Sequence, residues 1–422
     1  MSALKAKLAG QIPALRERVK NLAKNHGKKV ISEVTIEQVI GGMRGVKSLI
    51  CDTSEVGLDT GLIIRGIPIL ELTGKLPEEI FYLLLTGELP NETELKDLQS
   101  ELKKRSKIPG YIISILKAFP KDAHPMSVLS AIINALSYES AFRKEYDKGM
   151  KKDIYWDYAL EDSLDLIAKL PGIAAAIYRT RFGKGDIISS NPELDWGADY
   201  AYMLGVNNSD DWYNLMRMYM VIHSDHESGN VSAFTSHVVG SALADPYYTL
   251  AAGLNGLAGP LHGLANQECL KFVLELINHF GGVPTDEQLK EYAKQRLDKG
   301  LVIPGYGHAV LRVTDPRFNA SIEFGKKTIP DDERFRVVEK LFNIIPNLLI
   351  EQGKAKDPWP NVDAATGALL YHYGVTEFEY YTVIFSVSRA LGICAQNILS
   401  RAMGEPITRP KSVTINWLEN AK

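Results

Sequence analysis

The segment that most constrains the fold is VTEFEYYTVIFSVSRALGICAQNILSRAMG, residues 375–404, which is largely apolar for nearly thirty residues. Strands are rarely longer than about ten residues, so a run of this length is typical of a helix. Arg389 interrupts the run near its middle. A buried guanidinium is costly unless an anion meets it. The segment therefore predicts a long, mostly buried helix that carries one charged group.

Helix signals recur along the rest of the chain. In LPEEIFYLLLTG, Pro77 stands in a first turn and Gly87 follows the apolar stripe, so both ends of a helix are marked. Capping patterns predict further helices within residues 207–226, 244–260, 264–282 and 285–300. Strand patterns are confined to KKVISEVTIEQVI, residues 28–40, and TGLIIRGIPIL, residues 60–70. We expect an all-α protein with only short β pieces.

Composition excludes several functional classes. The 422 residues hold 48 Lys+Arg against 51 Asp+Glu, so no global positive field attracts nucleic acid. No stretch approaches eighteen uninterrupted apolar residues, so a membrane span is not expected. Cys51, Cys269 and Cys394 are odd in number and far apart, which favours reduced thiols. The basic N-terminal segment is interpreted as a surface helix, and a bacterial cytoplasm is the expected compartment, with a mitochondrial matrix as the alternative.

Known nucleotide and hydrolase motifs are missing. GxGxxG, the Walker A loop, GxSxG and tandem repeats do not occur, so nucleotide-binding α/β folds and serine hydrolases lose support. The candidates for chemistry lie in the Gly/Pro-rich segments GPLHG, IPGYGH and GKAKDPWPNVDAATG.

Three residues of these segments suit acid–base chemistry. His262 precedes a predicted helix start, where the helix dipole disfavours an imidazolium; the alternative is a histidine bonded to local backbone. His308 stands among Gly305 and Gly307, which let a backbone approach a ligand closely, or which simply form a turn. Asp363 is interpreted either as a helix N-cap or as a base whose pKa is raised by apolar surroundings.

Two further groups of residues suit anion binding. Arg317, Arg389 and Arg409 each interrupt an apolar or tightly turned segment, and three guanidinium forks suit a di- or tricarboxylate. Each alone is equally consistent with an ordinary ion pair. His223 and His226 are three residues apart, but no zinc-type ligand set accompanies them, so no metal is expected.

Together these motifs resemble one family. HSDHESGNVSAF, GLAGPLHGLANQE, PGYGHAVLRVTDPR, LIEQGKAKDPWPNVDA and SVSRALG with RPKS follow each other as in citrate synthases of the type found in mitochondria. The resemblance spans nearly the whole chain. It implies that acetyl-CoA and oxaloacetate condense to citryl-CoA, which is then hydrolysed to citrate and CoA.

The resemblance also implies roles for individual residues. Asp363 would take the methyl proton of acetyl-CoA, His262 would hydrogen-bond the thioester oxygen, and His308 would polarise the ketone of oxaloacetate. Oxaloacetate and citrate would be held by His226, Asn230, His308, Arg317, Arg389 and, from the neighbouring subunit, Arg409. CoA would be held by Arg44, Lys152, Val302, Ile303, Gly305, Tyr306, Arg312, Lys354 and Lys356.

The implied architecture is a homodimer with a closing domain. A large domain would comprise residues 1–263 and 375–422, and a mobile small domain residues 264–374. No tightly bound cofactor, metal, nucleic acid or membrane is implied. The departures are Lys152 in place of an arginine fork, Phe234 where histidine is common, and a shorter segment around LTGKLPEE. A 2-methylcitrate synthase using propionyl-CoA, and a non-catalytic protein that senses CoA or citrate, remain the alternatives.

Overall fold

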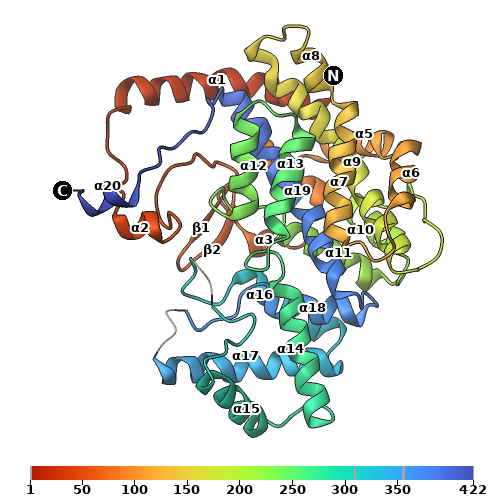
Figure 1. Ribbon diagram of the computed structural model, residues 1–422. Helices are drawn as coiled ribbons and strands as arrows, with labels where there is room; N and C mark the ends of the chain where they lie inside the picture. The colour runs from red at the N-terminus through yellow and green to blue at the C-terminus, as the bar shows by residue number, and fades with distance from the viewer. Residues whose placement is uncertain (1, 308–309, 354–356, 422) are drawn as a thin grey trace.

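The computed structural model describes residues 2–307, 310–353 and 357–421 and is mostly helical (Figure 1), which confirms the all-α class. The first half contains α1 (Ala3–His26), α2 (Ile36–Ile40), α3 (Ile69–Leu72), α4 (Pro77–Thr86), α5 (Glu92–Arg105), α6 (Gly110–Ala118), α7 (Pro125–Leu136), η1 (Ser137–Glu139), α8 (Ala141–Tyr146), η2 (Lys152–Ile154), α9 (Tyr155–Arg181) and α10 (Trp196–Leu204). The second half contains α11 (Asp210–Ile222), α12 (Val231–Ser241), α13 (Pro246–Leu257), α14 (Ala265–Phe280), α15 (Asp286–Asp298), α16 (Pro316–Thr328), α17 (Glu333–Gln352), α18 (Asp363–His372), η3 (Phe378–Tyr380), α19 (Tyr381–Met403) and α20 (Ile415–Glu419).

The core of the upper part in Figure 1 is built around α19, as the long apolar run predicts. Helix α19 packs along α9 and also contacts α13, α4 and α12. Residues Phe378–Met403 form the one helical segment of the described chain that is long and apolar enough to cross a membrane. Because 89% of its apolar window is buried inside the fold, we interpret it as a core helix.

The predicted helix ends are confirmed where a capping signal exists. Helix α4 begins at Pro77 and ends before Gly87, which adopts a left-handed φ of 80°. Helix α15 opens on a capping box in which Thr285 and Gln288 bond each other's backbone. Helix α13 starts with the Asp245 carboxylate accepting a hydrogen bond from the backbone N–H of Tyr248.

One of the two strand predictions is confirmed and the other is wrong. Strands β1 (Ser54–Gly57), β2 (Gly61–Ile64) and β3 (Ile67–Pro68) form a three-stranded antiparallel sheet in that order. Residues 28–40 contain no strand, because Thr35 and Gln38 make a capping box that starts α2 there. Gly61, with a φ of 74°, lies against the ring of Pro316, where a Cβ would come within 2.5 Å. The hairpin therefore sits directly on the start of α16.

Helices α14 to α18 form a group of their own at the bottom of Figure 1. Helix α14 packs on α17 and α18, α15 packs on α17, and α16 packs on α18. This group reaches the rest of the fold through α16, which contacts α3, α11 and β2.

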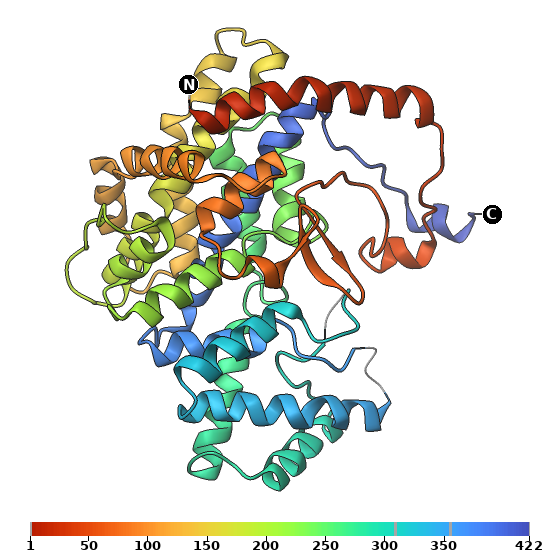
Figure 2. The same ribbon diagram turned by 180° about the vertical axis from the view of Figure 1, so that it is seen from behind.

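The two ends of the chain extend along one flank. Figures 1 and 2 both show α2 and α20 beside each other, away from the helical body. The segments that carry them expose many apolar side chains, among them Val30, Ile31, Ile40, Ile407, Ile415 and Trp417. Helix α12 adds Val231, Phe234 and Val238 to the exposed apolar surface. Apolar surface of this extent is typical of an interaction site.

Candidate active site

The loop between α11 and α12, residues Ser224–Asn230, is held from three directions. The buried Asp225 carboxylate accepts hydrogen bonds from Thr53 Oγ1, Ser54 Oγ (2.8 Å) and Gln396 Nε2 (2.7 Å). The backbone N–H of Gly392 donates to the carbonyl of Ser224 at 3.0 Å. The loop is thus fixed to the hairpin and to α19 at once, and it carries the predicted residues His226 and Asn230.

Asn230 ends this loop and caps α12. Its Oδ1 accepts a hydrogen bond from the backbone N–H of Ala233 at 3.1 Å. Its Nδ2 donates to the carbonyls of His226 at 2.9 Å and Glu227 at 3.2 Å. The Asn230 side chain is therefore bonded to the backbone of His226, the other predicted residue of the loop.

Arg389 lies at the centre of the region, only 2% exposed. Its Nε donates to the carbonyl of His223 at 3.1 Å, and its guanidinium stacks 4.8 Å from the ring centre of Phe385. Burial lowers its pKa to about 10, with the nearby Asp225 acting in the opposite direction and Arg317 in the same one. The group is still a cation at neutral pH, so it is a buried positive charge that an anionic ligand can meet.

Arg317, at the start of α16, is 4% exposed and already half engaged. Its Nε and Nη2 atoms form a two-pronged ion pair with the Asp315 carboxylate, with Nη2 at 2.7 Å from Oδ2. The guanidinium predicted to bind a substrate is thus held in place by a neighbouring acid.

His262 lies in the turn between α13 and α14. Its backbone N–H donates to the carbonyl of Gly259 at 3.0 Å, and its Nε2 lies 3.0 Å from Ser232 Oγ. Burial, followed by the charge of Arg389, lowers its pKa to about 4. Burial, rather than a helix N-terminus, therefore favours the neutral imidazole that the sequence predicts.

Asp363 is the first residue of α18, and Val362 is the capping position, so the N-cap interpretation is wrong. Burial raises the pKa of Asp363 to about 6, while Arg317 and Arg389 act in the opposite direction. These couplings mean that Asp363, Arg317 and Arg389 share one electrostatic environment. His262 belongs to it as well, through its coupling to Arg389.

The segments before His308 and before Asp363 are paired. Gly307 N–H donates to the carbonyl of Trp359 at 2.9 Å, and Asn361 N–H donates to the carbonyl of Gly305 at 2.9 Å. Asn361 Nδ2 adds a bond of 3.1 Å to the carbonyl of Gly307. His308 itself lies outside the described residues. The pairing joins residues 305–307 and 359–361 into one unit.

The residues predicted to bind CoA are only partly brought together. Gly305 and Tyr306 lie in the paired unit, the buried Ile303 accepts a hydrogen bond from the backbone N–H of Tyr306 at 3.3 Å, and Val302 is exposed. The Arg312 guanidinium bonds the carbonyls of Val310 and Leu311. Arg44 is exposed after α2, and Lys152 is exposed on η2. Lys354 and Lys356 lie outside the described residues. Arg409 is exposed on the C-terminal tail.

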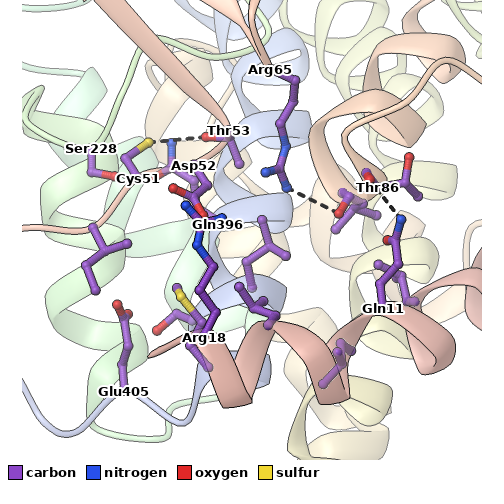
Figure 3. A pocket seen from close by; sticks show the side chains of 18 of the residues that line it. Gln11, Arg18, Cys51, Asp52, Thr53, Arg65, Thr86, Ser228, Gln396 and Glu405 are labelled. Carbon is purple, nitrogen blue, oxygen red and sulfur yellow. Dashed lines mark hydrogen bonds between the residues drawn. The ribbon is translucent and has the colours of Figure 1, made fainter. Parts of the chain in front are cut away.

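A cavity of about 190 Å³ lies behind the Ser224–Asn230 loop (Figure 3). Thr53, Ser228 and Gln396 line it, and these side chains also hold the loop, because Ser228 Oγ donates to Gln396 Oε1 at 3.2 Å. Among the described residues, none of those predicted for the site lines this cavity.

Sequence reasoning missed Ser232 and Asp315, and it considered a third residue, His223, only as a metal ligand. Ser232 bonds both Asn230 and His262, and Asp315 pairs with Arg317. His223 is fully buried and stacks 4.1 Å from the ring of Tyr219. Burial, then the charge of Arg317, lowers its pKa to about 3. Ser232 stands two positions after Asn230, and Asp315 stands two positions before Arg317. A search of the polar residues next to each candidate could have found both. Among the described residues no group of three metal-ligating side chains occurs.

Comparison with known proteins identifies relatives of the whole chain. A family model described as "Citrate synthase, C-terminal domain" matches residues 42–411. A probable mitochondrial citrate synthase of Glossina morsitans morsitans is 49% identical over 99% of this chain and 92% of its own length. The mitochondrial citrate synthase of Daucus carota is 48% identical, over 99% of this chain and 90% of its own length. The crystal structure of citrate synthase from Pyrobaculum aerophilum superposes with a TM-score of 0.81 at 28% identity, over 92% of this chain and 95% of that one.

Proposed function

The chain belongs to the citrate synthase family, and we propose that it joins acetyl-CoA to oxaloacetate and hydrolyses citryl-CoA through the trio His262, His308 and Asp363. The observation that carries the assignment of roles is the shared environment of a neutral imidazole, a carboxylate of raised pKa and a buried arginine. The carboxylate suits a base, the neutral imidazole suits a hydrogen-bond donor to the enolate, and the arginine suits a binding group for oxaloacetate.

Asp363 acts as the base. The methyl group of a thioester is a far weaker acid than a carboxylic acid, so the base must be as strong as a carboxylate can be while remaining ionised near neutral pH. A pKa of about 6 meets this need, since most of the group is ionised at pH 7. Its place at the first residue of α18 lets the helix fix the position of the carboxylate.

His262 stabilises the enolate. Because its pKa of about 4 keeps the ring neutral, it donates a hydrogen bond to the developing oxyanion without transferring a full charge. A preorganised donor of this kind is typically worth about 10² to 10³ in rate. Ser232 on α12 holds the ring from the other side at 3.0 Å.

His308 activates the second substrate, by the family resemblance. His226, Asn230, Arg317 and Arg389 bind oxaloacetate, and the buried charge of Arg389 supplies the main electrostatic attraction. The paired unit of residues 305–307 and 359–361 supports this division of roles. It makes the segments that carry His308 and Asp363 move together when residues 264–374 close as a small domain over the substrates.

The experiment that tests the function is release of free CoA thiol by the purified protein. Release with acetyl-CoA and oxaloacetate, at a higher kcat/KM than with propionyl-CoA, is the expected result. Preference for propionyl-CoA would instead support the 2-methylcitrate alternative. Oxaloacetate binding without thiol release would support the sensor alternative. Neither alternative is favoured by the family or the relatives.

The pH profile of kcat/KM for acetyl-CoA is expected to fall on the acid side with a midpoint near pH 6. As pH drops through the pKa of Asp363, the base takes up a proton and is lost, whereas His262 stays neutral until about pH 4. Bound oxaloacetate neutralises Arg317 and Arg389, which hold this pKa down, so kcat measured with saturating oxaloacetate should have its midpoint at or above that pH. A midpoint near pH 4 would contradict the role of Asp363.

We also propose a homodimer in which Arg409 completes the neighbouring subunit's site. Thr408 is held to α12 by contacts with His237 Nε2 (2.9 Å) and Ser241 Oγ (2.9 Å), so the tail leaves the body directly before Arg409. The exposed apolar side chains of the segment that carries α2, of the C-terminal tail and of α12 supply a surface for a second copy. Lys152, exposed on η2, is proposed to contact a CoA phosphate.

Mixing two inactive variants tests this arrangement. Arg409→Ala and His262→Ala homodimers should each be nearly inactive, but a hybrid dimer contains one site with both residues intact. Random exchange of subunits should restore about a quarter of the wild-type activity, since half of the dimers are hybrids with one working site each. Absence of any recovery, when subunit exchange is verified by mass spectrometry, would place Arg409 in its own subunit's site.

The enzyme needs no tightly bound cofactor in this proposal, because acetyl-CoA enters as a substrate. The relatives from Glossina and Daucus are mitochondrial by name, which supports the matrix alternative. A bacterial cytoplasm stays a prediction.

A further inference from the structure

The hairpin formed by β1 and β2 contacts two segments that carry residues proposed to bind oxaloacetate. Its residue pairs run from Ser54 and Ile64 at the base to Gly57 and Gly61 at the turn. Ile64 is fully buried and Leu62 almost so, which fixes the hairpin to the core of the fold. The base and the turn meet different parts of the chain.

The base of the hairpin holds the loop after α11. The Ser54 hydroxyl donates to the Asp225 carboxylate at 2.8 Å and accepts a hydrogen bond from the backbone N–H of Glu227 at 2.7 Å. Ser54 is only 5% exposed, so both bonds are shielded from water. These two bonds fix the residues on either side of His226, a proposed oxaloacetate ligand.

The turn of the hairpin holds the segment before Arg317. The backbone N–H of Arg312 donates to the carbonyl of Leu58 at 2.9 Å. Gly61 is buried so close to Pro316 that a Cβ on it would lie 2.5 Å from the ring atoms Cγ and Cδ. Carbon atoms pack best about 3.5 to 4 Å apart, so this contact requires a glycine.

The position of Pro316 determines the position of Arg317. The two residues open α16, and the Arg317 guanidinium is bonded to Asp315 on the other side of the proline. The backbone N–H of Asp315 donates to the carbonyl of Pro360 at 3.2 Å, which attaches the segment to the paired unit. Residues 315–317 are thus enclosed between the hairpin and that unit, so a shift of Pro316 shifts the guanidinium as well.

We propose that the hairpin is a spacer that sets the distance between Arg317 and the loop carrying His226, and that Gly61 and Ser54 are positioning residues for oxaloacetate. This inference rests on the proposed function, in which both sides bind that substrate. From Ser54 to Gly57 a strand extends only about 10 Å, at about 3.4 Å per residue. The two sides are therefore linked by a short paired element, and a change at its turn alters the spacing of the groups that the substrate must contact at once.

Gly61→Ala is the direct test. Its Cβ, 2.5 Å from the proline ring, forces Pro316 to withdraw by about 1 Å to reach a normal contact distance. A misplacement of about 1 Å can cost about 10² in rate. We expect kcat/KM for oxaloacetate to fall about 10- to 100-fold, mainly through KM, with a matching loss of oxaloacetate affinity in isothermal titration calorimetry. An unchanged affinity would overturn the proposal.

Two further variants separate the contact from backbone strain. Gly66→Ala places an alanine at a φ of 82°, close to the 74° of Gly61, but a Cβ there meets nothing within 4 Å. It should lose thermal stability yet keep wild-type affinity for oxaloacetate. Pro316→Ala removes the ring atoms that a Cβ at residue 61 strikes, so the double variant Gly61→Ala/Pro316→Ala should regain most of the affinity. An equal loss in Gly66→Ala, or no recovery in the double variant, would contradict the spacer.

Ser54→Ala tests the base of the hairpin and remains decisive if Gly61→Ala does not fold. It removes the bonds to Asp225 and Glu227, so KM for oxaloacetate should rise more than kcat falls. Thr60→Ala, which removes an exposed hydroxyl from the turn, is the matched control. Wild-type affinity in Ser54→Ala would refute the role of the base. Calorimetry needs no turnover, so a wild-type protein that binds oxaloacetate without releasing thiol refutes only the condensation, whereas an active enzyme whose variants bind normally refutes only the spacer.

Discussion

Replacing Asp363 by alanine is expected to lower kcat at least about 100-fold, because general-base catalysis typically contributes 10² to 10⁴ in rate. No other described carboxylate of this region has the same position: Asp315 is bonded to Arg317, and Asp225 is bonded to Thr53, Ser54 and Gln396. Thiol release under saturating substrates measures the effect.

Two further variants separate chemistry from folding. Asp363→Asn keeps the size of the side chain but removes its basicity, so it should be as inactive as the alanine variant while its thermal unfolding stays close to wild type. Asp331→Ala changes an exposed carboxylate before α17 and should leave kcat unaltered. Wild-type turnover by Asp363→Asn would refute the assignment of the base.

Replacing His262 by alanine is expected to lower kcat by at least about 10², the usual value of a donor aimed at a developing oxyanion. KM for oxaloacetate should change less than kcat, because the residues proposed to bind it, Arg317 and Arg389, are fixed by Asp315 and by the His223 carbonyl. Steady-state kinetics with both substrates varied distinguish the two parameters.

His279→Ala, on the exposed end of α14, is the matched control and should retain wild-type kinetics. A His262→Ala enzyme with an unchanged kcat and a raised KM for oxaloacetate would make His262 a binding residue rather than a catalytic one.

The sequence predicts helix ends well where a residue type strongly favours one backbone position. Pro77, Gly87 and Thr285 mark helix ends in the sequence and do so in the fold. The long apolar run around Arg389 is a buried helix, as its length requires. The apolar alternation of residues 28–40 was misleading, because a strand needs a partner, while the capping box at Thr35 is complete within the segment itself.

The sequence predicts a candidate set of site residues but not the bonds between them. The family motifs point to His262, Asp363 and Arg389, and the fold places them in one electrostatic environment. No pattern in the chain reveals that Asp315 occupies one edge of Arg317 or that Ser232 lies between Asn230 and His262. These contacts depend on distances between separate helices, and sequence spacing does not encode them.

Asp225 has a wider consequence. Its carboxylate accepts hydrogen bonds from Thr53 just before β1, from Ser54 in β1 and from Gln396 on α19. These bonds fix the loop after α11 to both elements. The loop is thereby ordered when the chain folds, so the conformational entropy of ordering it is not lost again when a substrate binds. In the proposed function, oxaloacetate therefore meets a preformed surface on this side, and the closing motion proposed for residues 264–374 supplies the rest of the site.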